Sequence, residues 1–219
     1  MKKETKTEKT TVRETYFLDK NKFCKEEVVE VRKRIISVYK NPPKYLKKDF
    51  YIEIKSELIT SLEGCPEKVN GLFIHNSRNL ISLKGSPKEI VYTFSIWGSP
   101  SLKTLKGGPE KVGYFYCSET SIKNLIGAPK KVNRGFDCSD NKLTSLKGCP
   151  KDFKGSLVCR NNKLTSLDEA PEEAKEIWCS GNPLNAKYLL EFSTKRPNTK
   201  IYHNGARYWK GIFDTGFEK

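Results

Sequence analysis

Apolar residues recur along the middle of the chain at intervals of about 21 residues, and each set ends in a proline. The marker prolines are Pro66, Pro87, Pro109, Pro129, Pro150 and Pro171. A Leu stands four residues before each of them, and a Leu or Ile stands three residues earlier still. Fixed spacing over most of a chain predicts a solenoid, in which each repeat covers the apolar face of its neighbour.

Two further sets of apolar residues predict one short strand in each repeat. Each set contributes one residue per repeat, and we call such a set a column. The two columns lie two residues apart, which places both of them on one side of a strand. Their fourteen members are Ile52, Ile54, Leu72, Ile74, Phe94, Ile96, Phe115, Cys117, Phe136, Cys138, Leu157, Cys159, Ile177 and Cys179. We therefore predict seven parallel strands, the first at 51–55, in repeats that span residues 50–184. In the second and third repeats this register requires a loop longer by one residue, and it keeps His75 and Trp97 outside the core.

The residues between these columns face away from the predicted core, and many of them are aromatic. Those on the first four strands are Tyr51, Phe73, His75, Trp97, Tyr114 and Tyr116, and those farther along are Asp137, Arg160 and Trp178. Aromatic residues favour strands for structural reasons alone. Each can bury about 150–250 Å², however, and six on adjacent strands make a larger patch than scattered surface aromatics. We predict that these nine residues form a partner-binding surface.

Two segments, FDCSDNKLTSL at 136–146 and LVCRNNKLTSL at 157–167, resemble the leucine-rich-repeat pattern L-x-L-x-x-N-x-L-x-x-L. The short period and the marker proline are most similar to the bacterial type found in secreted effectors, and similar arrays occur in proteins of tailed phages. The resemblance implies a curved parallel sheet in a non-catalytic protein that binds and modulates, or inhibits, a host defence protein. The Asn of the pattern is present only at Asn141, Asn162 and Asn182, so we expect less regular turns in the first four repeats.

The segments on either side of the repeats are expected to cap the solenoid, because its terminal apolar faces need cover. Residues 1–12, which are rich in Lys, Glu and Thr, predict a disordered basic arm. Residues 13–49 predict an N-terminal helical cap, with an amphipathic helix at 25–40 that ends at Pro42-Pro43. Residues 185–219 predict a C-terminal cap, with a short helix at 185–193 and a β-hairpin whose turn is Asn204-Gly205.

The formal charge of +15 is compatible with three classes of partner, namely nucleic acid, an anionic membrane and an acidic protein. Residues 1–50 carry +7 and residues 184–219 carry +4, so the repeats between them hold only +4. Basic ends favour encounter with an acidic protein partner. They also leave open an alternative in which the ends, and first of all the Lys-rich arm, bind RNA or DNA.

The seven cysteines and the first residues of the chain indicate a reducing compartment. No apolar segment near the start has the character of a signal peptide, and no run is long enough for a membrane span. Free thiols are typical of the cytoplasm. We therefore expect a cytoplasmic protein, in the host cytoplasm if it is viral, with no membrane partner.

Candidate catalytic and metal-binding groups are sparse. One core column contains four cysteines, and a thiol packs there as a small apolar residue. A straight file of cysteines does not supply the tetrahedral ligand set of a structural zinc site. The two histidines, His75 and His203, are far apart, and no P-loop, paired carboxylates or Ser/His/Asp pattern is present. We expect no enzyme, no cofactor, no metal and no small-molecule substrate.

Overall fold

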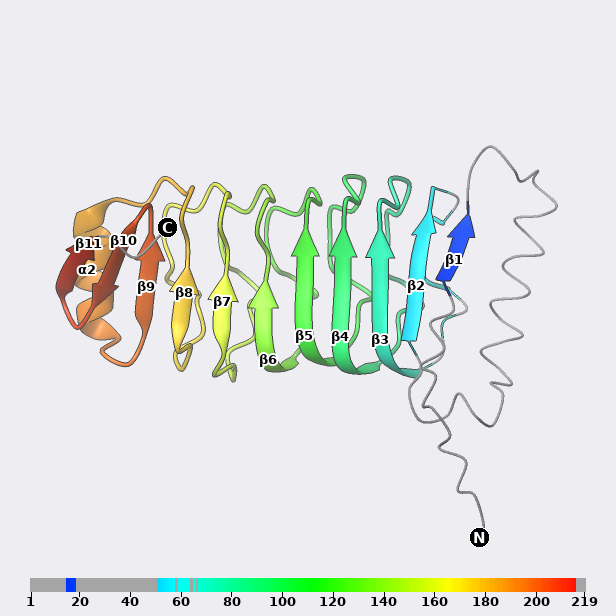
Figure 1. The fold of residues 1–219 in the computed structure, drawn as a ribbon, viewed down its shortest axis with the longest axis horizontal. Coiled ribbons are helices and arrows are strands. Elements are labelled where there is room, and N and C mark those ends of the chain that lie inside the picture. The colour runs from blue at the N-terminus through cyan, green and yellow to red at the C-terminus, as the bar shows by residue number, and fades with distance from the viewer. Residues whose placement is uncertain (1–14, 19–50, 58, 64, 66, 216–219) are drawn as a thin grey trace, which may run out of the picture.

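A computed structural model of the protein describes residues 15–18, 51–57, 59–63, 65 and 67–215. The repeats form a parallel β-solenoid, with one strand per repeat and the strands side by side in chain order (Figure 1). The seven predicted strands are all present, which confirms the repeat solenoid. They are β2 (Tyr51–Ser56), β3 (Lys68–His75), β4 (Glu89–Trp97), β5 (Lys111–Ser118), β6 (Lys131–Asp137), β7 (Ser156–Val158) and β8 (Glu176–Trp178).

Four further strands extend this row to an 11-stranded sheet. At one end β1 (Thr15–Leu18) pairs parallel with β2. At the other end β9 (Lys200–His203) pairs parallel with β8, and β10 (Ala206–Trp209) and β11 (Ile212–Thr215) follow in antiparallel order. The sequence pattern did not predict β1, which lies in the range assigned to a helical cap. The helix expected at 25–40 and the basic arm at 1–12 lie outside the described residues.

The two predicted apolar columns point into the solenoid, as expected. Each of the fourteen residues is at most 8% exposed, and most are fully buried. The register expected for the second and third repeats is also confirmed, because Leu72, Phe94 and Phe115 are aligned across three strands. Trp97 lies one residue beyond buried Ile96 and is 41% exposed. A third inward column, which the pattern analysis missed, consists of Val69, Ile90, Val112, Val132, Phe153 and Ala174.

Asparagine side chains connect the turns of the later repeats. Asn162 donates from Nδ2 to the carbonyls of Cys138, Cys159 and Arg160, and its Oδ1 accepts from the Leu143 N–H at 3.0 Å. Asn141 and Asn182 make equivalent bonds to their neighbouring repeats. These buried amides satisfy backbone groups that the strands leave unpaired.

The turns of the second and third repeats, which lack this Asn, are built differently. Each is longer by one residue and closes on itself through backbone hydrogen bonds, from the Leu80 N–H to the Ser77 carbonyl and from the Leu102 N–H to the Ser99 carbonyl, both 3.0 Å. The backbone residue just before the Asn position still has positive φ in these repeats, at Asn76 and Gly98. The turns of the second and third repeats therefore differ from the later turns in both length and hydrogen bonding.

The C-terminal cap closes the last repeat with a helix and a meander. α2 (Ala186–Lys195) matches the predicted helix, and Asn185 caps it by accepting from the Tyr188 N–H at 2.8 Å. The hairpin turn at Asn204-Gly205 has positive φ at both residues, as a type I′ turn requires. A second turn of the same kind, at Lys210-Gly211, leads into β11, which was not predicted.

Candidate binding surface

The outward rows of the sheet contain the residues that sequence reasoning selected. One row runs through Glu53, Phe73, Ser95, Tyr116, Asp137, Val158, Trp178 and Tyr202. The rows beside it contain Tyr51 and Tyr114 on one side and His75 and Trp97 on the other. Arg160 lies in the turn two residues after β7. The backbone of Tyr51 is paired with Gly71, and its side chain is outside what the structure describes.

Five of these residues come together on β3, β4 and β5, and we name them the aromatic patch: Phe73, His75, Trp97, Tyr114 and Tyr116. Phe73 and His75 stack with ring centroids 6.4 Å apart, and Tyr114 and Tyr116 stack at 6.0 Å. Trp97 and Tyr116 are 41% and 37% exposed, and the other three are partly exposed. Stacking orients these rings on the outer face of the sheet.

Two polar contacts lie at the border of the aromatic patch. The indole Nε1 of Trp97 donates to Glu119 Oε1 at 3.0 Å. His75 Nε2 lies 3.8 Å from Glu53 Oε1. Partial burial raises the pKa of the Tyr116 hydroxyl, and the nearby Tyr114 and Asp137 raise it further, so this hydroxyl is neutral at physiological pH.

Gly135 makes room for one ring of the patch. A Cβ atom at Gly135 would lie 2.9 Å from Cδ1 of Tyr114, which shows that the tyrosine ring leans over the next strand. The guanidinium of Arg134 lies over the same ring, 5.7 Å from its centroid, in the range of a cation–π contact. Sequence reasoning missed this cation beside the patch, because Arg134 lies in the part of β6 where the pairing with β5 shifts register.

A second aromatic group lies on β8 and β9, near the C-terminal end of the repeats. The rings of Trp178 and Tyr202 are nearly parallel, with centroids 3.9 Å apart, and Arg160 lies over Trp178 at 4.9 Å. The Trp178 indole donates to Glu176, which also accepts from Ser156. Sequence reasoning found Arg160 and Trp178 but missed Tyr202. Of the nine predicted residues, five form the aromatic patch, and Arg160 and Trp178 belong to this second group. Asp137 lies between the two groups, where its carboxylate accepts from the Ser139 N–H.

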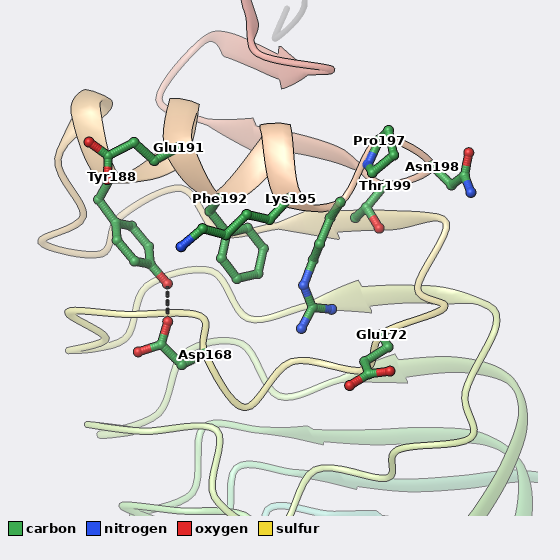
Figure 2. A pocket seen from close by; sticks show the side chains of 10 residues that line it. Asp168, Glu172, Tyr188, Glu191, Phe192, Lys195, Pro197, Asn198 and Thr199 are labelled. Atoms are coloured by element: carbon green, nitrogen blue, oxygen red, sulfur yellow. Dashed lines mark hydrogen bonds between the residues drawn. The ribbon is translucent and has the colours of Figure 1, made fainter.

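A hollow of about 580 Å³ lies away from both groups, where α2 meets the last repeat (Figure 2). The Tyr188 hydroxyl donates to Asp168 at 2.9 Å, and Arg196 donates to the carbonyls of Ala170 and Pro171. Burial raises the pKa of Tyr188 to about 12. These contacts join the C-terminal cap to the repeats. Because Tyr188 and Arg196 make structural hydrogen bonds there, we assign the hollow to the junction between the cap and the last repeat and not to a binding site.

The cysteines of the core column are free thiols buried among apolar side chains, as expected from their packing role. Burial raises the pKa of the Cys117, Cys138 and Cys159 thiols well above its usual range. Within the described part of the chain, no group of three or more His, Cys, Asp or Glu side chains is arranged to hold a metal ion. The one described helix is too short to cross a membrane.

No protein-family model matches the chain, and no curated protein matches it either.

Proposed function

We propose that the protein is a non-catalytic binding module, and that the aromatic patch on the outer face of β3, β4 and β5 contacts a protein partner. One observation carries this proposal: Trp97 and Tyr116 are 41% and 37% exposed, whereas their inward neighbours Ile96, Phe115 and Cys117 are fully buried. The inward residues form the apolar core between stacked repeats. Exposed aromatic side chains on the other face are not part of this core, and partner binding accounts for their clustering there.

The chemistry of the patch fits a protein partner better than a small molecule. The patch spans three strands about 4.8 Å apart on an open sheet face, and Trp and Tyr are enriched among residues that dominate protein interfaces. Glu53, Glu119 and Asp137 around it supply polar contacts of the kind found at an interface rim. The resemblance to repeats of bacterial effectors and tailed phages favours a host protein as the partner and the host cytoplasm as the place of action.

The direct test is affinity capture from host-cell lysate, quantified by mass spectrometry. The test variant is Trp97→Ala with Tyr116→Ala. The matched control is Ile81→Ala with Ile126→Ala, which removes two exposed apolar side chains (59% and 38%) from turns outside the strands. We expect a set of proteins that the wild type and the control retain and the test variant loses. Equal capture by all three proteins would refute the proposal.

Nucleic-acid binding through the basic ends is the competing function. Its likeliest element by composition, residues 1–12, lies outside the described residues. Nuclease treatment of the lysate separates the two functions, because protein capture through the aromatic patch survives it. Capture that disappears with nuclease, and with deletion of residues 1–12, would instead favour the nucleic-acid role.

A further inference from the structure

The two residues after each marker proline form a row of charges along one margin of the sheet, at the start of the strands. In four of the six pairs one residue is basic and the other is acidic. The pairs are Glu67-Lys68, Lys88-Glu89, Glu110-Lys111, Lys130-Lys131, Lys151-Asp152 and Glu172-Glu173. The Lys130-Lys131 pair, at the start of β6, departs from this balance with two positive charges, and the last pair, Glu172-Glu173, departs from it with two negative charges.

Three ion pairs connect neighbouring repeats along this row or next to it. Lys68 Nζ lies 2.9 Å from Glu89, Lys88 lies 3.6 Å from Glu110, and Lys154 in the next turn lies 3.1 Å from Glu173. In the described part of the chain, Lys130 and Lys131 form no such ion pair. The Cα partner of Lys131 on the preceding strand is Lys111, another cation.

The two lysines line a hollow of about 430 Å³ together with Val132, Asn133, Asp152 and Lys154. The hollow exists because neighbouring strands differ in length. β6 begins at Lys131, but β7 has only three residues and pairs with β6 from Gly135 onward. The first half of β6 therefore has no strand beside it on that side.

The basic hollow lies beside the aromatic patch, because β6, which supplies Lys131 to the hollow, pairs with β5 of the patch. Lys111 and Tyr114 lie on the same strand, and Lys131, Arg134 and Gly135 lie on the next. Arg134 is over the Tyr114 ring, so a positive group already reaches from β6 onto the patch. A partner that contacts Tyr114 and Tyr116 would pass within reach of Lys130 and Lys131.

We propose that the hollow binds an acidic segment of the protein partner, one whose Asp or Glu residues contact Lys130 and Lys131 while neighbouring apolar residues contact the aromatic patch. This inference rests on the proposed function and specifies the chemistry of the partner. Charge complementarity selects the occupant, because two unpaired lysines in a partly enclosed hollow favour carboxylates. A nucleic-acid backbone needs a continuous basic track, and here Asp152 lines the hollow and Glu110 and Glu173 lie in the adjoining repeats.

The test uses the full-length protein and fluorescence anisotropy with three labelled probes. The probes are a short peptide that alternates Glu with Leu and Tyr, the same peptide with Gln for each Glu, and an oligothymidylate of similar length. The test variant is Lys130→Gln with Lys131→Gln. The matched control is Lys68→Gln with Lys88→Gln, which removes the same charge from the same row at lysines that are already paired.

We expect the Glu peptide to bind the wild type about tenfold more tightly than the Lys130→Gln, Lys131→Gln variant, since two charge-assisted contacts are lost. The control should change the affinity by less than about twofold, and the Gln peptide should bind weakly to all proteins. If the test and control variants lost affinity for the Glu peptide equally, the peptide would be held by the overall positive charge of the protein, and the inference would be overturned. Tighter binding of oligothymidylate than of the Glu peptide, lost with Lys130 and Lys131, would also overturn it.

The Trp97→Ala, Tyr116→Ala variant separates failure of this inference from failure of the proposed function. If that variant loses the Glu peptide while the Lys130→Gln, Lys131→Gln variant keeps it, the aromatic patch is the binding surface and the acidic-segment site is refuted. If only the lysine variant loses the peptide, the acidic-segment site is supported and the aromatic patch is refuted as part of the surface.

Discussion

Replacement of Asn162 by Ala tests the hydrogen-bonded ladder that holds the later repeats together. Asn162 is 7% exposed and makes four hydrogen bonds of 2.9 to 3.1 Å to backbone groups of two repeats. The Cys138 and Cys159 carbonyls keep a second donor, from Asn141 and Asn182 respectively. The Leu143 N–H, in contrast, loses its recorded acceptor.

The loss of stability in Asn162→Ala follows from this difference between the carbonyls, which keep a donor, and the Leu143 N–H, which does not keep its acceptor. An orphaned buried N–H costs about 1–3 kcal/mol, and each bond to a carbonyl that keeps another donor contributes about 0.5–1.5 kcal/mol. We therefore expect Asn162→Ala to lower the free energy of unfolding by about 3 kcal/mol or more. Asn162→Asp should cost still more at neutral pH, because a carboxylate would face the three carbonyls that now accept from Nδ2.

Urea unfolding followed by circular dichroism, under reducing conditions, measures the effect as a shift in the midpoint. Asn124→Ala is the matched control, because the Asn124 side chain accepts a single bond, from the Ile126 N–H at 3.1 Å, at an exposed site. It should cost about 1 kcal/mol or less. Costs for Asn162→Ala and Asn124→Ala that agree within about 0.5 kcal/mol would refute the proposed role of the ladder.

Two further predictions concern a close backbone approach and a buried thiol. Gly148 has φ of +92°, and a Cβ there would lie 2.5 Å from the Leu125 carbonyl, whereas a Cβ at Gly205 meets nothing within 4 Å. Gly148→Ala should therefore destabilise by at least about 2 kcal/mol more than Gly205→Ala in urea unfolding, and equal costs would contradict the close packing of the turns. Burial raises the pKa of the Cys149 thiol from 9.0 to about 12 in the folded protein. The folded state therefore holds this proton more tightly than the unfolded state does. The resulting contribution to stability is fully present below pH 9 and is lost as pH rises toward 12. Between pH 8 and 10.5 the wild type should lose about 2 kcal/mol more stability than Cys149→Ala, and parallel losses would refute the assignment.

The core was predictable from the sequence because a strict period constrains it. The outward position of Trp97 followed once Ile96 was placed in its column, and both are where the period predicts. The difference between early and late turns followed from Ser77 and Ser99 standing where later repeats have Asn.

The missed features depend on contacts that the period does not encode. Tyr202 continues the row of Trp178, but the residues of α2 intervene, so no marker spacing connects the two. β11 escaped notice because Ile212 and Phe213 are both exposed and show no apolar alternation, although Lys210-Gly211 carries a turn signal like that of Asn204-Gly205. The basic hollow depends on the short length of β7, which only pairing in three dimensions determines.

Hydroxyl-radical footprinting tests most directly whether the aromatic patch faces solvent. Oxidation rates are measured by mass spectrometry for Trp97, Tyr116, Phe94 and Phe115, each relative to its rate in the urea-unfolded protein. Trp97 and Tyr116 should retain about a third or more of their unfolded rates, in line with exposures of 41% and 37%, and Phe94 and Phe115, which are 0% exposed, should be almost unreactive. Protection of Trp97 and Tyr116 together with oxidation of Phe94 and Phe115 would contradict the account.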